Sequence, residues 1–499
     1  MAGDKKAVRR SDGDVAATTK RARTEAAPPA AASPDAALVN EYAGFVVPAA
    51  DFALERVHID DVTPESFFAK YVATRTPVVL TGFIRDEAFQ APAKWTNAYL
   101  AETAGDERLS VERRSSTTDK FGKGIHVPMT FRELLALIAQ GDAMHYLTTQ
   151  EVAVNDDEGG RPELMASFVA KLQRDGFPLR PALLGNLVPQ NINIWMGNNT
   201  AGSSSGLHHD YHDNLYLLLR GKKRFRLYSP ADAAKMYTRG RLVRVHANGR
   251  INYAGEETTA YGADPSFEQD ALAHFEKVDA EKELELAERA VENGEDGAEA
   301  RLEAAEERLD RAMMRVLRAE RDDEPEGDDS SDENGAFHFD DDDDEEEEEE
   351  EAVAQEDAAP AAATNAENKP QEVKYPVSFS RVDTALLQDP TTKAQLEAEF
   401  PEFTTANAAF CELQEGEMLF LPASWFHEVE SYGSANGHLA LNYWFHPPDQ
   451  FDSFDTPYSS PLWPRDWDLR FDENGKREAV ALEEDDEGEG SDEEDEQSS

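Results

Sequence analysis

The stretch from Ser203 to Pro230, SSSGLHHDYHDNLYLLLRGKKRFRLYSP, constrains the fold most, because it joins metal-binding residue types to a β-strand. Its first part holds three histidines and two aspartates within six positions, and an apolar and basic run follows. Two histidines and one carboxylate can hold Fe(II) and leave positions open on the ion. Side chains at i and i+2 of a strand share a face, so His208 with Asp210, or Asp210 with His212, could supply two ligands.

A third ligand should come from a later strand. The stretch LPASWFHEVES offers His427, which follows the turn-forming Pro422 and has aromatic neighbours. His438 and His446 are alternatives in the same region. A single histidine in a strand is more often structural than a ligand, so spacing alone does not choose among the three.

The rest of the chain predicts a mainly β fold with flanking helices. Short apolar runs such as PVVLTGF, AMHYLTTQE, NINIWMG and GHLALNYWFHPP are separated by Gly, Pro and Asn turns, which is typical of an antiparallel sandwich or barrel. Thr63 followed by Pro64 marks a helix start, and TFRELLALIAQ has the periodicity of an amphipathic helix.

An insertion interrupts the strands from about Asp264. It is rich in Ala, Glu, Leu and Arg, with Leu302, Leu309 and Val316 at heptad spacing, and NGEDG breaks it in the middle. This pattern predicts two helices in an antiparallel hairpin, and the alternative is one helix that frays into disorder.

Charge is concentrated in two acidic runs. The formal net charge is -53, and residues 322–357 hold 22 acidic and no basic residues, while residues 483–496 hold 11 acidic residues. Such runs repel themselves and predict disorder. Their expected partners are basic protein surfaces, whereas direct binding of nucleic acid is disfavoured because phosphate contacts need Lys and Arg. The alternative is an inert, solubilising insertion.

The compartment is predicted from the N-terminus and the single cysteine. The N-terminus carries two short basic clusters, DKKAVRR and TTKRART, in an Ala, Pro and Ser context and no apolar signal core. Such clusters can act as a nuclear import signal. Cys411 alone cannot form an intramolecular disulfide, and no run approaches the roughly 20 apolar residues of a membrane span. We therefore expect a nuclear or cytoplasmic protein without a membrane partner.

The motifs together resemble the JmjC family of Fe(II)- and 2-oxoglutarate-dependent oxygenases, which fold as a double-stranded β-helix (cupin, or jelly roll). The likeness rests on the opening stretch, on GEMLFLPASWFHEVES, and on ATRTPVVLTGF and NINIWMGNN upstream. It implies His208, Asp210 and His427 as the metal and catalytic ligands, with His212 as a polar neighbour. It also implies Fe(II) as the metal, and 2-oxoglutarate and O2 as cosubstrates.

The resemblance implies Lys223 as the residue that binds the far carboxylate of 2-oxoglutarate. Strand alternation supports this role independently, because Lys223 shares its face with Phe225 and Leu227. A lysine on an apolar face needs a buried anion. By the same resemblance, Asn214, Asn442 and Tyr146 contact the cosubstrate or line its pocket, although each could instead be a satisfied polar group of the core. Ser205 stands where relatives often have a Thr that contacts the cosubstrate, and it keeps the hydroxyl.

The domain organisation follows from these patterns. We expect, in chain order, a disordered basic tail (1–40), the first part of the cupin domain (41–263), a helical insertion (264–321), an acidic disordered insertion (322–372), the second part of the cupin domain with a C-terminal extension (373–475), and an acidic disordered tail (476–499).

The function predicted on the resemblance is a dioxygenase that acts on a basic protein, of the histone or ribosomal protein type, and hydroxylates a side chain. Demethylation of N-methyl lysine or arginine begins with the same C–H abstraction and is the first alternative. A single cysteine excludes the Cys-rich zinc fingers of many chromatin demethylases, which favours the hydroxylase. A non-catalytic acidic scaffold that binds histones through the acidic insertion is the second alternative. The oligomeric state is left open.

Overall fold

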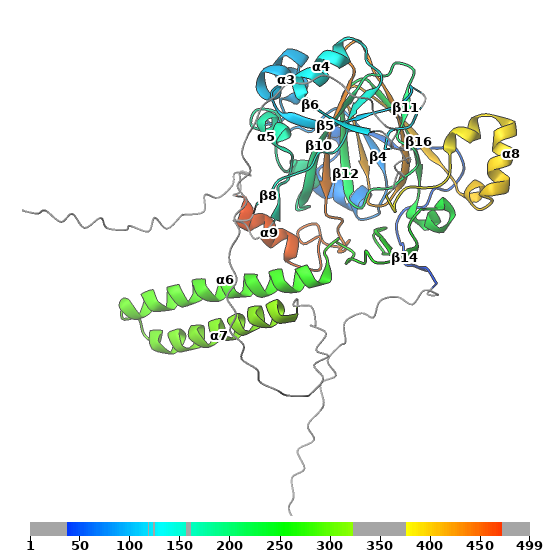
Figure 1. Cartoon of the computed structure of the whole chain (residues 1–499). Helices are drawn as coiled ribbons and strands as arrows, with labels where there is room; N and C mark the ends of the chain where they lie inside the picture. The colour runs from blue at the N-terminus through cyan, green and yellow to red at the C-terminus, as the bar shows by residue number, and fades with distance from the viewer. Residues whose placement is uncertain (1–36, 118, 123–124, 156–160, 323–375, 472–499) are drawn as a thin grey trace, which may run out of the picture. The chain divides into compact units, whose positions relative to one another are not determined.

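The structure is a computed structural model, and it describes residues 37–117, 119–122, 125–155, 161–322 and 376–471 (Figure 1). The two basic clusters and the second acidic run lie outside the described residues, as does the first acidic run beyond Asp322. Within the described ranges, no helix is both long and apolar enough to cross a bilayer.

Two large sheets dominate the fold (Figure 1). The nine-stranded sheet has the order β3 (Arg56–His58), β4 (Val78–Thr81), β17 (Glu417–Leu421), β12 (Asp213–Arg220), β19 (His438–Phe445), β10 (Pro189–Gly197), β7 (His145–Leu147), β5 (Arg108–Arg113) and β6 (Ile125–Thr130). The five-stranded sheet has the order β11 (Ser203–Ser204), β18 (Phe426–Tyr432), β13 (Lys222–Tyr228), β16 (Ala409–Gln414) and β2 (Phe52–Ala53). Two small sheets pair β1 (Val39–Asn40) with β14 (Leu242–Val245) and β15 (Ile251–Tyr253), and β8 (Val154–Asn155) with β9 (Arg161–Pro162).

The chain passes back and forth between the two large sheets. β10, β12, β17 and β19 lie in the larger sheet, and the intervening β11, β13, β16 and β18 lie in the smaller one. β12 pairs antiparallel with both β17 and β19, while β13 pairs antiparallel with both β16 and β18. These eight strands form a jelly-roll core, so the predicted fold class is confirmed.

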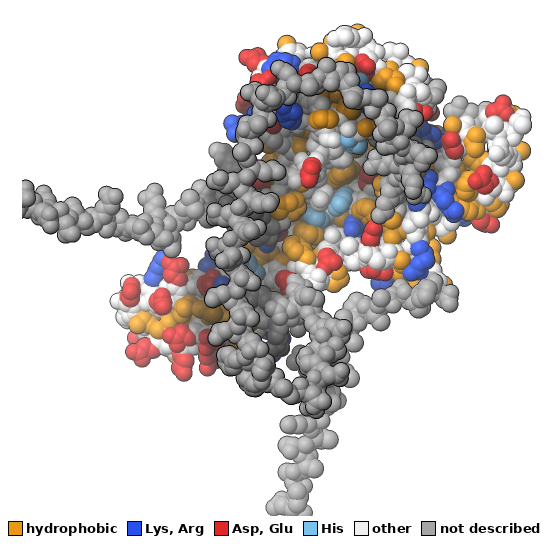
Figure 2. Space-filling model, in the orientation of Figure 1, with side chains coloured by type: hydrophobic (Ala, Val, Ile, Leu, Met, Phe, Trp, Pro, Cys, Tyr) orange, Lys and Arg blue, Asp and Glu red, His pale blue; other side chains and the backbone are white. Residues whose placement is uncertain are grey.

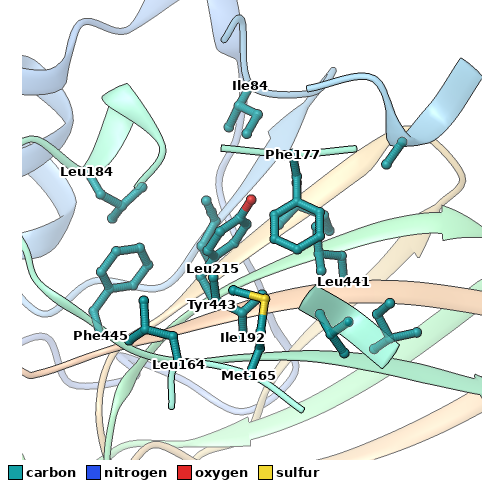
Figure 3. Close-up of a cluster of buried hydrophobic side chains, with 14 of the residues drawn as sticks. Ile84, Leu164, Met165, Phe177, Leu184, Ile192, Leu215, Leu441, Tyr443 and Phe445 are labelled. Carbon is teal, nitrogen blue, oxygen red and sulfur yellow. The ribbon is translucent and has the colours of Figure 1, made fainter. Parts of the chain in front are cut away.

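Two apolar layers stabilise the core. One lies between the sheets and includes Leu218, Phe225 and Leu227. The other covers the outer face of the larger sheet, where Figure 3 shows side chains of β10, β12 and β19 packed against residues from outside the sheet. The residues labelled there are Ile84, Leu164, Met165, Phe177, Leu184, Ile192, Leu215, Leu441, Tyr443 and Phe445.

Helices at the N-terminal side and at the end of the chain supply much of the outer layer. Thr63 caps the first helix and Thr130 caps the fourth, each in a capping box, as the Thr63–Pro64 pair and the amphipathic run predict. The helices outside the insertion are α1 (Pro64–Phe67), α2 (Ala91–Lys94), α3 (Asn97–Ala104), α4 (Phe131–Ala139), α5 (Ser167–Gln173), α8 (Pro390–Glu399) and α9 (Leu462–Arg470).

The described part of the insertion forms two helices, α6 (Pro265–Glu292) and α7 (Ala298–Asp322), which lie side by side in Figure 1. Arg308 pairs with Glu283 and Arg315 pairs with Glu276. The partner number falls as the arginine number rises, so the two helices run antiparallel.

The described chain returns to the core at Pro376. The segment from Val377 to Val382 makes only isolated bridges, Phe379 with His208 and Ser380 with Thr238. It nevertheless lies directly against the segment that carries the predicted metal ligands.

Candidate metal centre

The structure brings the three predicted metal ligands together. Within the described residues, His208, Asp210 and His427 form a group whose donor atoms all lie within 4.8 Å of one another. His427 Nε2 lies 3.6 Å from Asp210 Oδ2, and the centroids of the two imidazole rings are 4.4 Å apart. One ion could therefore contact all three side chains. Figure 2 shows histidine side chains reaching the face of the barrel that is turned to the viewer.

The backbone fixes the spacing between these ligands. His208 and His427 exchange both of their main-chain hydrogen bonds, at 3.0 and 2.7 Å. The carbonyl of Asp210 accepts from Ser424 N at 2.8 Å, so a second bond ties the same two segments. β12 begins only at Asp213, however, so the expectation that His208 and Asp210 lie in a strand is wrong. The main-chain pairing of His208 with His427, at the start of β18, brings the ligands together instead.

Hydrogen bonds also orient the two imidazole rings. His208 Nδ1 lies 3.0 Å from the carbonyl of Gly206, and His427 Nδ1 lies 2.9 Å from that of Trp425. Because a carbonyl oxygen only accepts, Nδ1 donates in both rings and Nε2 is free for a metal ion. Burial, and then the neighbouring His427, lower the pKa of His208 to about 4, which favours the neutral ring that a metal requires. This donor set fits a divalent metal ion.

Lys223 is completely buried inside the barrel. On β13 it shares the inward face with Phe225 and Leu227, as the alternation predicts. Its Nζ donates to Ser431 Oγ at 2.6 Å and to Tyr146 Oη at 3.3 Å, and the described residues place no carboxylate on it. Burial lowers its pKa to about 7. A buried amine that is held only by hydroxyl groups fits the carboxylate of a bound anion.

Three of the other four predicted residues line the same interior. Tyr146 contacts Lys223 and stacks on Phe121 with ring centroids 4.2 Å apart. Asn442 Nδ2 donates to Asn214 Oδ1 at 3.2 Å, and both asparagines are buried. Burial raises the pKa of Tyr146, so its hydroxyl keeps its proton at neutral pH.

Ser205 is the predicted residue that the structure joins least to this interior. Its hydroxyl donates to the carbonyl of Gly206 at 3.0 Å and accepts from Val429 N at 3.1 Å. Both bonds serve the backbone that leads to His208. The structure thus gives Ser205 a role in shaping that segment.

The competing histidines lie outside the group of three. His212 lies near the rings of Trp444 and His446, and His446 stacks on Trp463 with centroids 3.7 Å apart. His438 is buried beside Tyr146, with ring centroids 5.4 Å apart.

Comparison with known proteins identifies the family. The family model of a cupin-like domain matches residues 64–451, which cover most of the chain from α1 through β19. JmjC domain-containing protein 4 of Schizosaccharomyces pombe is 32% identical over 425 residues, which make up 80% of this chain and 86% of that protein. The chain belongs to the JmjC family of cupin-like proteins.

Two further JmjC relatives are more distant. The human bifunctional peptidase and (3S)-lysyl hydroxylase JMJD7 is 24% identical over 34% of this chain and 52% of its own length. Lysine-specific demethylase 8 of Xenopus tropicalis is 26% identical over 44% of this chain and 47% of its own length.

Two residues that contact the predicted residues of this JmjC site were not predicted from the sequence. Ser431 binds Lys223, and Trp195 Nε1 donates to Asn442 Oδ1 at 2.7 Å. The first contact depends on the β13–β18 register, in which Lys223 lies opposite Ser431. No local pattern in the sequence reveals which residues of β13 and β18 lie opposite each other. By contrast, the alternation of side chains in NINIWMG could have shown that Trp195 lies on the same strand face as Asn193.

Proposed function

We propose that this protein is an Fe(II)- and 2-oxoglutarate-dependent dioxygenase that hydroxylates a side chain of a protein substrate. The observation that carries the proposal is the combination of the three-ligand group with the buried Lys223 in one barrel. Two histidines and one carboxylate are the ligand set of non-haem Fe(II) oxygenases. A second, cationic anchor deeper in the barrel suits a dicarboxylate such as 2-oxoglutarate.

Each residue has a task in this reaction. Bound Fe(II), with 2-oxoglutarate and O2, supplies the oxidation that inserts oxygen into a substrate C–H bond and leaves succinate and carbon dioxide. His208, Asp210 and His427 would hold the ion, and the carbonyls behind the two rings keep Nε2 aimed at it. Lys223 would pair with the far carboxylate of the cosubstrate.

The substrate class is inferred from the relatives and from the charge of the chain. One JmjC relative is named a lysyl hydroxylase and another a lysine-specific demethylase, so a basic residue of a protein is the best candidate target. The acidic runs favour a basic partner through electrostatic attraction. A histone or ribosomal protein in the nucleus or cytoplasm would suit both arguments.

Succinate formation tests the proposal. Purified protein with Fe(II), ascorbate, O2 and 2-oxoglutarate should form succinate, and basic nuclear protein fractions should stimulate it. Asp210→Ala should abolish turnover. The matched control is Asp106→Ala, because Asp106 lies on the exposed surface, where it pairs with Arg132. Equal turnover in the Asp210→Ala protein would refute the proposal.

Mass spectrometry of the stimulating protein separates the remaining candidates. A product heavier by one oxygen atom identifies a hydroxylase, whereas loss of a methyl group identifies a demethylase. Binding of basic proteins that persists in Asp210→Ala, without succinate formation in the wild type, would support the non-catalytic acidic scaffold.

A further inference from the structure

The segment from Val377 to Val382 forms one wall of the metal centre. It is the first described part of the chain after the acidic insertion. Ser380 N donates to the carbonyl of Leu207 at 2.9 Å, and Phe379 forms an isolated antiparallel bridge with His208. The backbone on which the first metal ligand lies is therefore bonded to this segment on one side and to His427 on the other.

The segment is itself held firmly on its far side. Gly240 N donates to the carbonyl of Val377, and Arg239 N donates to that of Phe379, both at 2.9 Å. Ser380 Oγ, which is buried, donates to the carbonyl of Met236 at 2.6 Å. These bonds fix the main chain of Phe379 and therefore the place from which its side chain projects.

The ring of Phe379 stacks on the imidazole of His208. Their centroids are 4.8 Å apart and their planes differ by 15°. Gly122 lies close to the phenyl ring, because a Cβ added to this glycine would lie 3.4 Å from Phe379 Cε1. Phe379 therefore has His208 and Gly122 as neighbours.

This stacking supplies a restraint that the hydrogen bonds of His208 lack. The bond from Nδ1 to the carbonyl of Gly206 sets the direction of one ring atom, but the ring plane can still tilt about that bond. The ring of His427 contacts His208 at an inclined angle of 54°, so it does not fix the plane from the opposite face. The nearly parallel phenyl ring does.

We propose that Phe379 is a positioning residue for the metal ligand His208, and that it makes the segment after the insertion part of the metal centre. The inference rests on the proposed function in one respect, namely that a metal ion binds here. Phe379 touches neither metal nor substrate in this role. It acts by keeping His208 Nε2 aimed at the ion.

Direct metal titration tests this role without relying on turnover. Co(II) would be added to the full-length protein, and its affinity and ligand-field absorption spectrum recorded. Phe379→Ala should bind Co(II) about tenfold more weakly and with an altered spectrum, within the range known for loss of a residue that orients a ligand. Phe379→Tyr keeps the ring and should match the wild type.

Two more variants control for misfolding and for a general effect of removing a phenyl ring. Phe379→Leu keeps apolar volume without a planar ring and should also bind Co(II) more weakly, which serves if the alanine variant fails to fold. Phe83→Ala is the matched control, because Phe83 is half-buried like Phe379 and packs against Phe89 in the outer apolar layer, after the end of β4. It should leave Co(II) binding unchanged.

The outcomes separate this role from the proposed function. Absence of Co(II) binding by the wild-type protein would defeat the metal site itself and the role of Phe379 with it. Wild-type binding with equal affinity and an equal spectrum in Phe379→Ala or Phe379→Leu would overturn only the positioning role.

Discussion

Lys223 makes the binding of an anion inside the barrel depend on pH. Its pKa is lowered by burial to about 7, whereas a lysine in an unfolded chain titrates near 10.4. Between these two pKa values the unfolded state binds more protons than the folded state. Lys223 therefore lowers the free energy of unfolding of the ligand-free protein at low pH, and this free energy recovers as pH rises from about 7 to about 10.4. A bound carboxylate reverses the preference, because it favours the ammonium form.

We therefore predict that 2-oxoglutarate binding takes up a proton above about pH 7. Its affinity should fall by up to about tenfold per pH unit between about pH 7 and about pH 9. Calorimetry in two buffers with different ionisation enthalpies, with Mn(II) in the metal site, measures both effects. Lys223→Arg stays charged throughout and should lose the pH dependence, while an unchanged wild-type affinity across the range would contradict the prediction.

A buried ion pair contributes to the stability of the barrel. Arg75 and Asp213 form an ion pair with almost no exposed surface, and Asp213 also accepts from Ala423 N at 2.8 Å. Asp213→Ala should lower the free energy of unfolding by about 3–5 kcal/mol, because it leaves a buried guanidinium without its partner. Urea denaturation measures the loss. Asp106→Ala removes an exposed pair and should cost at most about 1 kcal/mol; equal losses in the two variants would show that burial does not matter here.

The sequence pointed to three side chains that the structure brings together, but it did not predict the geometry that does so. Alternation left His208 with Asp210, or Asp210 with His212, as equal choices, and only the family resemblance separated them. In the structure these residues precede β12, and the pairing of His208 with His427 brings the ligands together. A contact between residues more than 200 positions apart leaves no periodic trace in either segment.

At the scale of elements, the passage from one sheet to the other depends on Gly221. This residue alone separates β12 from β13, and it has a φ of 86°. An added Cβ would lie 2.7 Å from both His438 Cβ and the carbonyl of Tyr432. Since the next residues lead directly to Lys223, the conformation of this turn also places the buried lysine.

Gly221→Ala is therefore expected to be more damaging than an ordinary substitution at a left-handed glycine. Gly141 has a φ of 80° with nothing within 4 Å of an added Cβ, so Gly141→Ala carries only the backbone strain, about 1–2 kcal/mol. Gly221→Ala should cost at least about 1 kcal/mol more, because His438 or the backbone must also shift. Thermal and urea unfolding of the two variants gives the difference, and similar losses would mean that the turn relaxes easily.

The helical hairpin shows where heptad analysis succeeds and where it misses the contact. Leu302, Leu309 and Val316 predicted the repeat, but all three are only half-buried in α7. The buried positions include two series of alanines spaced by seven residues, and alanines at such positions leave room for a close approach of two helices: Ala273, Ala280 and Ala287 in α6, and Ala298, Ala305, Ala312 and Ala319 in α7. Heptad analysis favours large apolar residues, so it found the period and not the closest contact.

At the scale of the whole molecule, the two acidic runs differ in what they adjoin. The run of residues 322–357 begins at the end of α7, and the chain then returns to the core at the segment that packs on His208. The run of residues 483–496 follows α9, which contacts α6. Residues 358–376 link the first run to the segment that packs on His208, so we expect this run to act more strongly on a substrate that approaches the candidate metal site.

Neutral replacement of the acidic residues in 323–357, at constant length, tests this expectation. For a basic protein substrate, kcat/KM at low ionic strength should fall by about tenfold, because electrostatic steering raises association rates by at least that factor. Added salt should then change kcat/KM little, since the charges it screens in the wild type are gone. Succinate formation without protein substrate should stay at the wild-type level, because His208, Asp210, His427 and Lys223 are untouched. The same replacement in 483–496 is the control, and it should lower kcat/KM by a smaller factor. If kcat/KM of the variant changed in 323–357 still depended on salt as in the wild type, the acidic insertion would not attract the substrate.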